Sequence, residues 1–139
     1  MCAQFGWDNL AISLDNAAGS PVVMTSYVTG INSVDVEHIL EELTPAGVAW
    51  EAWAAVGLGK MGTIELSGAF DDAATTGPNA VFYEADPATK VARTLLITWG
   101  STKTTSCEVY IGKYSRAAAK GGLTKYTVTL QPTGTVTEA

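Results

Sequence analysis

The segment 123–131 constrains the fold most strongly, because its side chains alternate between apolar and polar residues over the length of a strand. One face carries Tyr126, Val128 and Leu130, whereas Lys125, Thr127 and Thr129, which alternate with them, face the other way. This two-residue period is typical of a β-strand with one buried face and does not fit a helix. The segment therefore predicts an amphipathic strand.

Further extended runs, separated by turns that contain glycine or proline, occur along the rest of the chain. They cover 10–15, 22–28, 31–36, 62–70, 91–99 and 107–114. Such a series is typical of all-β folds. We therefore predict a mainly β protein, a β-sandwich or barrel of about seven antiparallel strands with one short flanking helix and a long inter-strand loop. The length of 139 residues suits a single domain spanning 1–139.

The flanking helix is predicted within 75–85. Pro78 is suited to a first helical position after a Thr-Gly cap, and Val81, Phe82 and Ala85 then share one face. An Asp-Pro pair ends the segment. We expect a helix of one to three turns with Phe82 pressed onto a sheet.

A structural motif is predicted just before and at the start of this helix. Phe70 is expected to anchor the end of a strand, and Asp71 or Asp72 to cap the turn into the helix. If Phe70 is buried, its replacement by alanine should cost about 3–5 kcal/mol. The motif consists of Gly68, Phe70, Asp71, Asp72, Gly77 and Pro78.

The segment 34–59 departs from the strand pattern and is long for a connection within a compact domain. Its first part is compatible with a short helix, and a Thr-Pro-Ala-Gly turn then interrupts it. Trp50 and Trp53, which follow, share a face only if their segment is helical, whereas in a strand they point to opposite faces.

The apolar side chains of this segment can be buried in two ways, inside the chain's own core or as an arm that packs on a neighbouring subunit. Large exposed apolar patches usually mark partner sites, and tryptophan is enriched at the centres of interfaces. The candidates for assembly contacts are Val36, Ile39, Leu40, Leu43, Trp50, Trp53 and Val56.

Charge is distributed unevenly along the chain. Residues 1–59 contain seven acids and no lysine or arginine, whereas residues 60–139 contain seven acids and all eight bases. Such asymmetry suits a molecule whose one face meets the opposite face of another copy. The net charge of −6 argues against a protein that grips nucleic-acid phosphates. The locally basic region 101–125 is better explained as a solvated face or a protein contact.

No constellation of catalytic or metal-ligating residues is visible in the sequence. His38 is the only histidine, and no serine lies in a nucleophile-elbow pattern. Two distant cysteines and one histidine make a zinc site improbable, and no phosphate-binding loop is present. No membrane span or secretory signal is visible. We therefore expect no catalytic residue, no cofactor, no metal and no membrane partner.

The order of the motifs resembles the tail tube (major tail) proteins of long-tailed bacteriophages. The resemblance covers most of the chain. It is carried by LDN at 14–16, GSPV at 19–22, YV at 27–28, INSV at 31–34, Thr44, Gly47 and Trp50, GL at 57–58, IELSG at 64–68, FDD at 70–72, GPNA at 77–80 and YTVTLQPTG at 126–134.

The resemblance implies that six β-barrel or sandwich subunits close into a ring and that rings stack into a tube through which the genome passes. The long loop would then reach across subunits or to the next ring. It also implies further partners (tape measure, terminator and distal tail proteins), DNA only as transiting cargo, and a virion tail assembled in the bacterial host cytoplasm. Acidic candidates for the lumen or the ring face are Asp35, Glu37, Glu41, Glu42 and Glu51.

Two alternatives remain open from the sequence. A tube protein of type VI secretion or of a contractile particle shares the barrel and ring plan. A β-sandwich module that binds carbohydrate or protein would present several exposed aromatic residues on one face, and Tyr110, Tyr114 and Tyr126 could supply them.

Overall fold

The computed structural model describes residues 6–83 and 91–139, apart from the side chains of Val56 and Leu58. Two 3-10 turns and one α-helix accompany nine strands in this part of the chain. The 3-10 turns are Trp7–Asn9 and Thr25–Tyr27, and the helix α1 is Pro78–Phe82. The strands are β1 (Ala11–Asp15), β2 (Pro21–Val23), β3 (Gly30–Ile31), β4 (Val36–Glu42), β5 (Trp53–Met61), β6 (Ile64–Ala69), β7 (Arg93–Trp99), β8 (Lys103–Ala117) and β9 (Lys125–Glu138).

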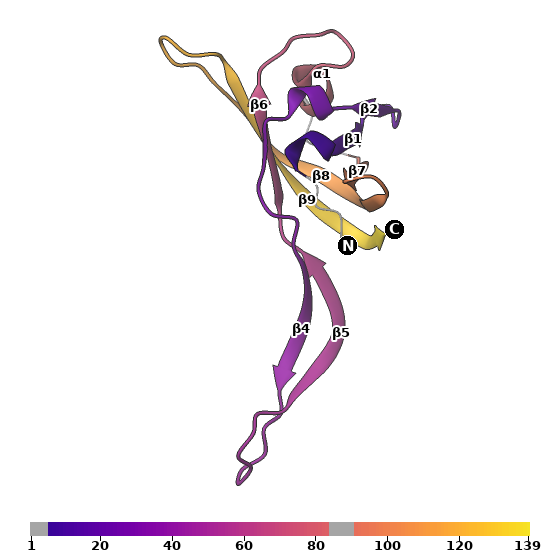
Figure 1. Cartoon of the computed structure of the whole chain (residues 1–139), viewed down its shortest axis with the longest axis vertical. Coiled ribbons are helices and arrows are strands. Elements are labelled where there is room, and N and C mark those ends of the chain that lie inside the picture. The colour runs from indigo at the N-terminus through magenta and orange to yellow at the C-terminus, as the bar shows by residue number, and fades with distance from the viewer. Residues whose placement is uncertain (1–5, 84–90) are drawn as a thin grey trace.

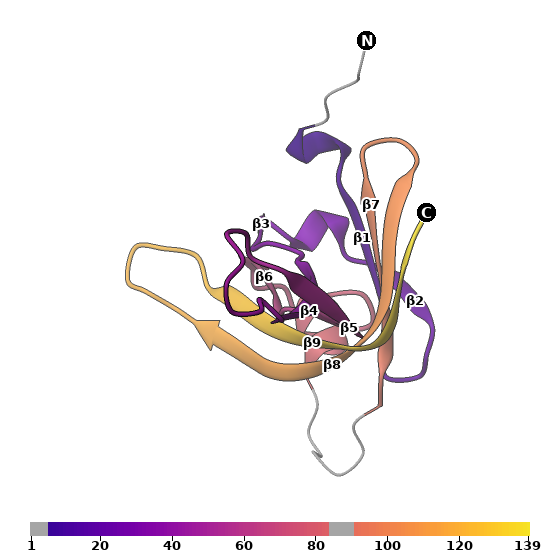
Figure 2. The ribbon, with the colours of Figure 1, turned by 90° about the horizontal axis from the view of Figure 1, so that it is seen from below.

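Seven strands form one antiparallel sheet in the order β2-β1-β7-β8-β9-β6-β3, and the sheet curls around the core as a half-barrel (Figures 1 and 2). β4 and β5 pair only with each other and form a separate two-stranded sheet. The predicted mainly β class with about seven antiparallel strands in one body is confirmed. The predicted strand 22–28 is divided between β2 and a 3-10 turn. Of the predicted strand 31–36, only Ile31 in β3 and Val36 at the start of β4 lie in strands.

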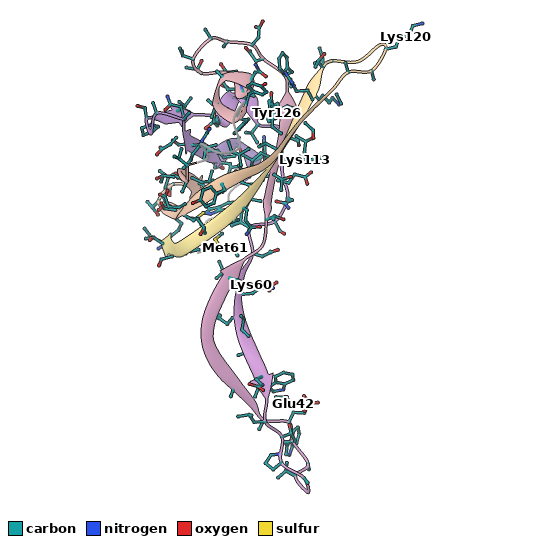
Figure 3. All side chains as sticks on the ribbon, turned by 180° about the vertical axis from the view of Figure 1, so that it is seen from behind. Glu42, Lys60, Met61, Lys113, Lys120 and Tyr126 are labelled. Carbon is teal, nitrogen blue, oxygen red and sulfur yellow. The ribbon has the colours of Figure 1, made fainter. Side chains whose placement is uncertain are left out.

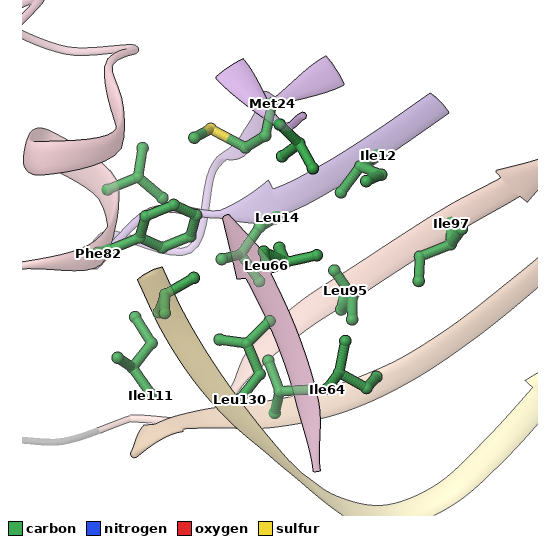
Figure 4. Close-up of a cluster of buried hydrophobic side chains, with 14 of the residues drawn as sticks. Ile12, Leu14, Met24, Ile64, Leu66, Phe82, Leu95, Ile97, Ile111 and Leu130 are labelled. Atoms are coloured by element: carbon green, nitrogen blue, oxygen red, sulfur yellow. The ribbon is translucent and has the colours of Figure 1, made fainter. Parts of the chain in front are cut away.

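The core lies on the concave face of the curled sheet, where alternate residues of each strand meet (Figure 4). β6 shows the pattern clearly, since Ile64 and Leu66 are fully buried and Glu65 between them is exposed. Tyr126, Val128 and Leu130 are buried in the same way, which confirms the face predicted from their alternation.

The helix α1 covers one end of this core. The predicted helix is present but short, with Pro78 in its first turn, and its expected contact Ala85 lies outside the described residues. Phe82 is fully buried, with its ring centroid 5.6 Å from that of Tyr126 and 6.0 Å from that of Tyr114. The buried guanidinium of Arg93, on β7, donates to the carbonyl of Val81 and ties the helix to the sheet.

The chain passes very close to the sheet at Gly68. A Cβ added at this glycine would lie only 2.0 Å from the carbonyl oxygen of Tyr27, so no side chain fits there. The hydroxyl of Tyr126, the cross-strand partner of Gly68, donates to the same carbonyl at 2.7 Å. The residue without a side chain and the buried phenol together fix the 3-10 turn Thr25–Tyr27 against the sheet.

The other motif residues lie between β6 and α1. Phe70 is half-buried, so the condition for the 3–5 kcal/mol estimate is not met, and its amide donates to the carbonyl of Thr124 at 2.9 Å. Asp71 accepts from the amide of Ala73 at 2.8 Å and so closes a turn before the helix, while Asp72 is exposed. The N-cap of α1 is Gly77, which has no capping side chain and whose added Cβ would meet backbone atoms at 2.9 Å.

Candidate assembly interface

The most conspicuous surface of the molecule is the arm, defined here as residues 36–61, which comprises β4, β5 and the loop between them. The arm projects away from the half-barrel along the long axis of the molecule (Figure 1). Its strands pair from Val36 opposite Met61 at the root to Glu42 opposite Trp53 near the tip. The register shifts between His38 and Leu40, beside Gly57 with its φ of +88°. The short helix considered for the start of this segment is therefore wrong.

β4 is a strand because hydrogen bonds at the tip of the arm close a hairpin that brings β5 beside it. The amide of Leu43 donates to the carbonyl of Ala52 at 2.7 Å, and the amide of Ala52 donates to the hydroxyl of Thr44 at 3.0 Å. Gly47 supplies the positive φ of +87° that the loop needs. Once β5 is available as a partner, β4 gains a hydrogen-bonded ladder that overrides its weak helical periodicity.

Except for Met61 at the root, which belongs to the core, the described large apolar side chains of the arm are exposed instead of packed on the chain's own body. Trp50 in the tip loop is 86% exposed and Trp53 in β5 is 55% exposed. The other candidates with described side chains are also exposed, namely Val36, Ile39, Leu40 and Leu43, together with Val48, while the side chain of Val56 lies outside the described part. Burial within the chain, one of the two possibilities that the sequence left open, does not occur for these residues.

Both faces of the arm carry apolar residues. Leu40 lies on one face, and its neighbours along the strand, Ile39 and Glu41, lie on the other. An isolated two-stranded hairpin is only marginally stable in water, and exposed apolar patches of this kind mark partner sites. The arm is therefore the candidate interface of the molecule.

The acidic candidates all lie on the arm or at its root, and all are exposed. At the root, Asp35 accepts from the hydroxyl of Ser33 at 2.8 Å, and Glu37 pairs with Lys60 at 3.4 Å. Toward the tip, Glu42 accepts from Thr44 at 3.0 Å and Glu51 accepts from the indole N–H of Trp53 at 3.2 Å. The structure thus brings the predicted acidic and apolar residues together on one projecting element.

Sequence reasoning missed a groove of about 650 Å³ between the root of the arm and β9. It is lined by Val36 and 59–61 on the arm and by 131–136 on β9. β6 pairs with β9 only as far as Leu130, so the following part of β9 lacks a neighbour from β6 on that side. The signal that the sequence offered for this groove was a glycine inside a strand, Gly134. In the structure it has a φ of +74° and lies in the β-bulge of this part of β9.

The three tyrosines do not form an exposed platform. Tyr126 is fully buried, Tyr114 is half-buried against Phe82, and only Tyr110 is exposed. Burial, and to a smaller extent its neighbour Tyr114, raises the pKa of Tyr126 well above the usual range of a phenol. The alternative of a binding module with an aromatic face therefore loses the feature that suggested it.

The described residues contain no cluster of three or more histidine, cysteine or acidic side chains that could hold a metal ion. His38 lies exposed on the arm opposite Gly59. Cys107 is a buried free thiol, and burial raises its pKa. Among the described helices none is long and apolar enough to cross a membrane.

The curled sheet with its short helix and projecting hairpin is the fold of protein chains from phage-tail-like particles. The whole chain superposes on a chain from the tail of an empty gene transfer agent (GTA) particle, computed with C6 symmetry, with a TM-score of 0.71, 18% identity and 99% of each chain covered. A chain of the virion of the native GTA particle matches with a TM-score of 0.70, 15% identity and 99% of each chain covered.

A chain of the baseplate of the anti-feeding prophage (AFP), 6-fold symmetrised, matches with a TM-score of 0.70 and 10% identity, over 100% of this chain and 97% of that one. No family model and no curated protein matches the sequence. The resemblance to tail tube proteins is thus confirmed at the level of the fold.

Proposed function

We propose that this protein is a structural subunit of a tail tube, which closes into hexameric rings that stack into a conduit for a genome. The observation that carries the proposal is the arm, whose exposed apolar residues on both faces call for burial by another copy. The fold shared with chains of six-fold symmetric tail and baseplate particles supports it.

Ring closure would also cover the two edge strands of the sheet, whose outer backbone N–H and C=O groups lack a neighbouring strand among the described residues. The sheet ends in β2 and β3, which are only three and two residues long, and unpaired edges are sites of aggregation. Lateral contact between copies would cover these edges. Contact between rings is heterologous, with one face against a different face, so it propagates into a filament.

In this function the whole chain, 1–139, acts as one tube-like domain, with 34–59 as its assembly loop. The work is structural and requires no catalytic residue or cofactor. An acidic lining of the lumen would repel DNA phosphates, so that DNA passes as cargo without being bound. Tape measure, terminator and distal tail proteins are the further partners, in a virion tail assembled in the host cytoplasm.

Electron microscopy of the purified protein tests the proposal directly. The wild type should form rings or tubes, and Trp50→Ala/Trp53→Ala should remain a folded monomer that forms neither, because both indoles are exposed on the arm. Trp7→Ala is the matched control, since Trp7 is also about half exposed but lies outside the arm, and it should still assemble. Unfolding of the double variant, or tubes formed by it, would contradict the role of the arm.

A tube inside a type VI secretion or contractile particle is the second candidate, favoured by the likeness to an AFP baseplate chain. Particles recovered with an outer layer of a second protein around the tube would support this candidate. Bare tubes alone would favour a tail without such a layer.

A further inference from the structure

The molecule carries opposite charges at its two ends. One end is the tip of the arm. The other is the end of the basic hairpin, defined here as residues 113–125, which runs from the body of the sheet out to the turn between β8 and β9. Figure 3 shows Glu42 toward one end of the long axis and Lys120 at the other. The nine residues of β5 alone span about 30 Å. That length exceeds the screening length of about 8 Å at physiological salt, so the two ends do not neutralise each other within one chain.

The acidic end retains free charge at its tip. The root pair of Glu37 and Lys60 is neutral, whereas Glu41, Glu42 and Glu51 have no cation within ion-pair distance among the described residues. Exposed apolar side chains lie beside these carboxylates, above all Trp50 and Trp53. The tip therefore combines apolar anchors with a negative rim, as protein interfaces commonly do.

The basic hairpin is the complement of this tip. It contains four cations and no acid, and all four are exposed: Lys113, Arg116, Lys120 and Lys125. Arg116 is held in place, because its guanidinium donates to Asn79 at 3.3 Å and stacks over the ring of Tyr114 at 5.6 Å. Leu123, between these cations, is 73% exposed and offers an apolar surface to an indole.

We propose that the acidic arm tip of one copy docks on the basic hairpin of a second copy. The proposal rests on the proposed function, and it names the two surfaces that meet when rings stack. Complementary charge fixes the direction of docking, because arm against arm or hairpin against hairpin would oppose like charges. Since the two surfaces lie at opposite ends of the molecule, each copy that docks presents a fresh partner surface, and the contact repeats along the tube.

Charge reversal tests the contact, with stacking measured by sedimentation and electron microscopy. Glu41→Lys/Glu42→Lys and Lys120→Glu/Lys125→Glu should each raise the protein concentration needed for stacking by about tenfold or more, because like charges then face each other. A chain that carries all four reversals should recover stacking, since the two surfaces are complementary again. Lys103→Glu, which reverses an exposed lysine outside the hairpin, should stack as the wild type does.

Stacking should also weaken with added salt in the wild type, and single rings should replace tubes. Suppose that the wild type forms tubes. If the double charge reversals then have no effect on stacking, or if the variant with all four reversals does not recover stacking, this inference is overturned and the tube function still stands. A wild type that forms neither rings nor tubes would overturn the tube function and this inference with it. Fluorescence anisotropy with labelled duplex DNA covers the other partner: binding that Lys120→Glu/Lys125→Glu abolishes, with stacking unchanged, would make the hairpin a phosphate site and overturn the inference.

Discussion

The half-barrel and the arm are built from similar residues and yet bury them differently. Leu66 in β6 is fully buried, whereas Leu40 in β4 is 54% exposed, although both lie in antiparallel strands. The half-barrel covers one face of its sheet with a helix and a 3-10 turn from the same chain. The arm has no such cover within the described residues. An apolar strand thus becomes part of the core when another segment of the same chain covers its face. It is left available for association when no such segment covers it.

The largest expected effect is the contrast between one substitution made in the two regions. Leu66→Ala should lower the free energy of unfolding of the monomer by about 2–5 kcal/mol, because it leaves a cavity in the core. Leu40→Ala should change it by no more than about 0.5 kcal/mol, because the side chain is already exposed. Urea unfolding of dilute protein, followed by circular dichroism, measures both. Equal losses for the two variants would show that the arm is part of the folded core.

A smaller effect on the free energy of unfolding is expected at Gly68, where the backbone of Tyr27 lies against the sheet. Gly68→Ala places a Cβ against the carbonyl of Tyr27, and relieving this overlap should cost about 1–3 kcal/mol. Gly122→Ala is the matched control, because a Cβ there meets nothing closer than 3.8 Å and φ is not positive. Its stability should stay within about 0.5 kcal/mol of the wild type. A neutral Gly68→Ala would mean that the crossing is looser than described.

The smallest effect concerns the buried hydroxyl of Tyr126. Tyr126→Phe removes its hydrogen bond to Tyr27 and should cost about 1 kcal/mol at neutral pH. Burial raises the pKa of Tyr126 and of Tyr114 in the folded state. The unfolded chain therefore releases these protons first, and the stability of the wild type should fall as the pH rises above about 10, the usual pKa of tyrosine.

Chemical denaturation of the wild type and of Tyr126→Phe between pH 8 and about pH 11 measures this dependence. The variant should lose less stability over the range, and the remaining slope is expected from Tyr114. Parallel curves for the two proteins would show that Tyr126 does not titrate differently on folding.

Local sequence was sufficient to predict an element where its pattern is compatible with only one kind of secondary structure. The alternation around Val128 predicted a strand and its buried face, and Pro78 predicted where the short helix begins. The segment 34–59, singled out in the sequence, contains β4 and most of β5, which form a sheet of their own. Sequence did not predict that this segment is a hairpin, because the spacing of Val36, Ile39 and Leu40 fits a helix as well as a strand.

The sequence by itself therefore determined which residues are apolar, which are charged and which period each run follows, because these properties belong to single side chains and their spacing. Only the tertiary structure decided which apolar segments are buried by other parts of the chain. It placed Tyr27 across Gly68, left Trp50 in solvent, and put Glu42 of the arm and Lys120 of the basic hairpin toward opposite ends. These outcomes depend on contacts between residues far apart in the chain, which no local pattern encodes.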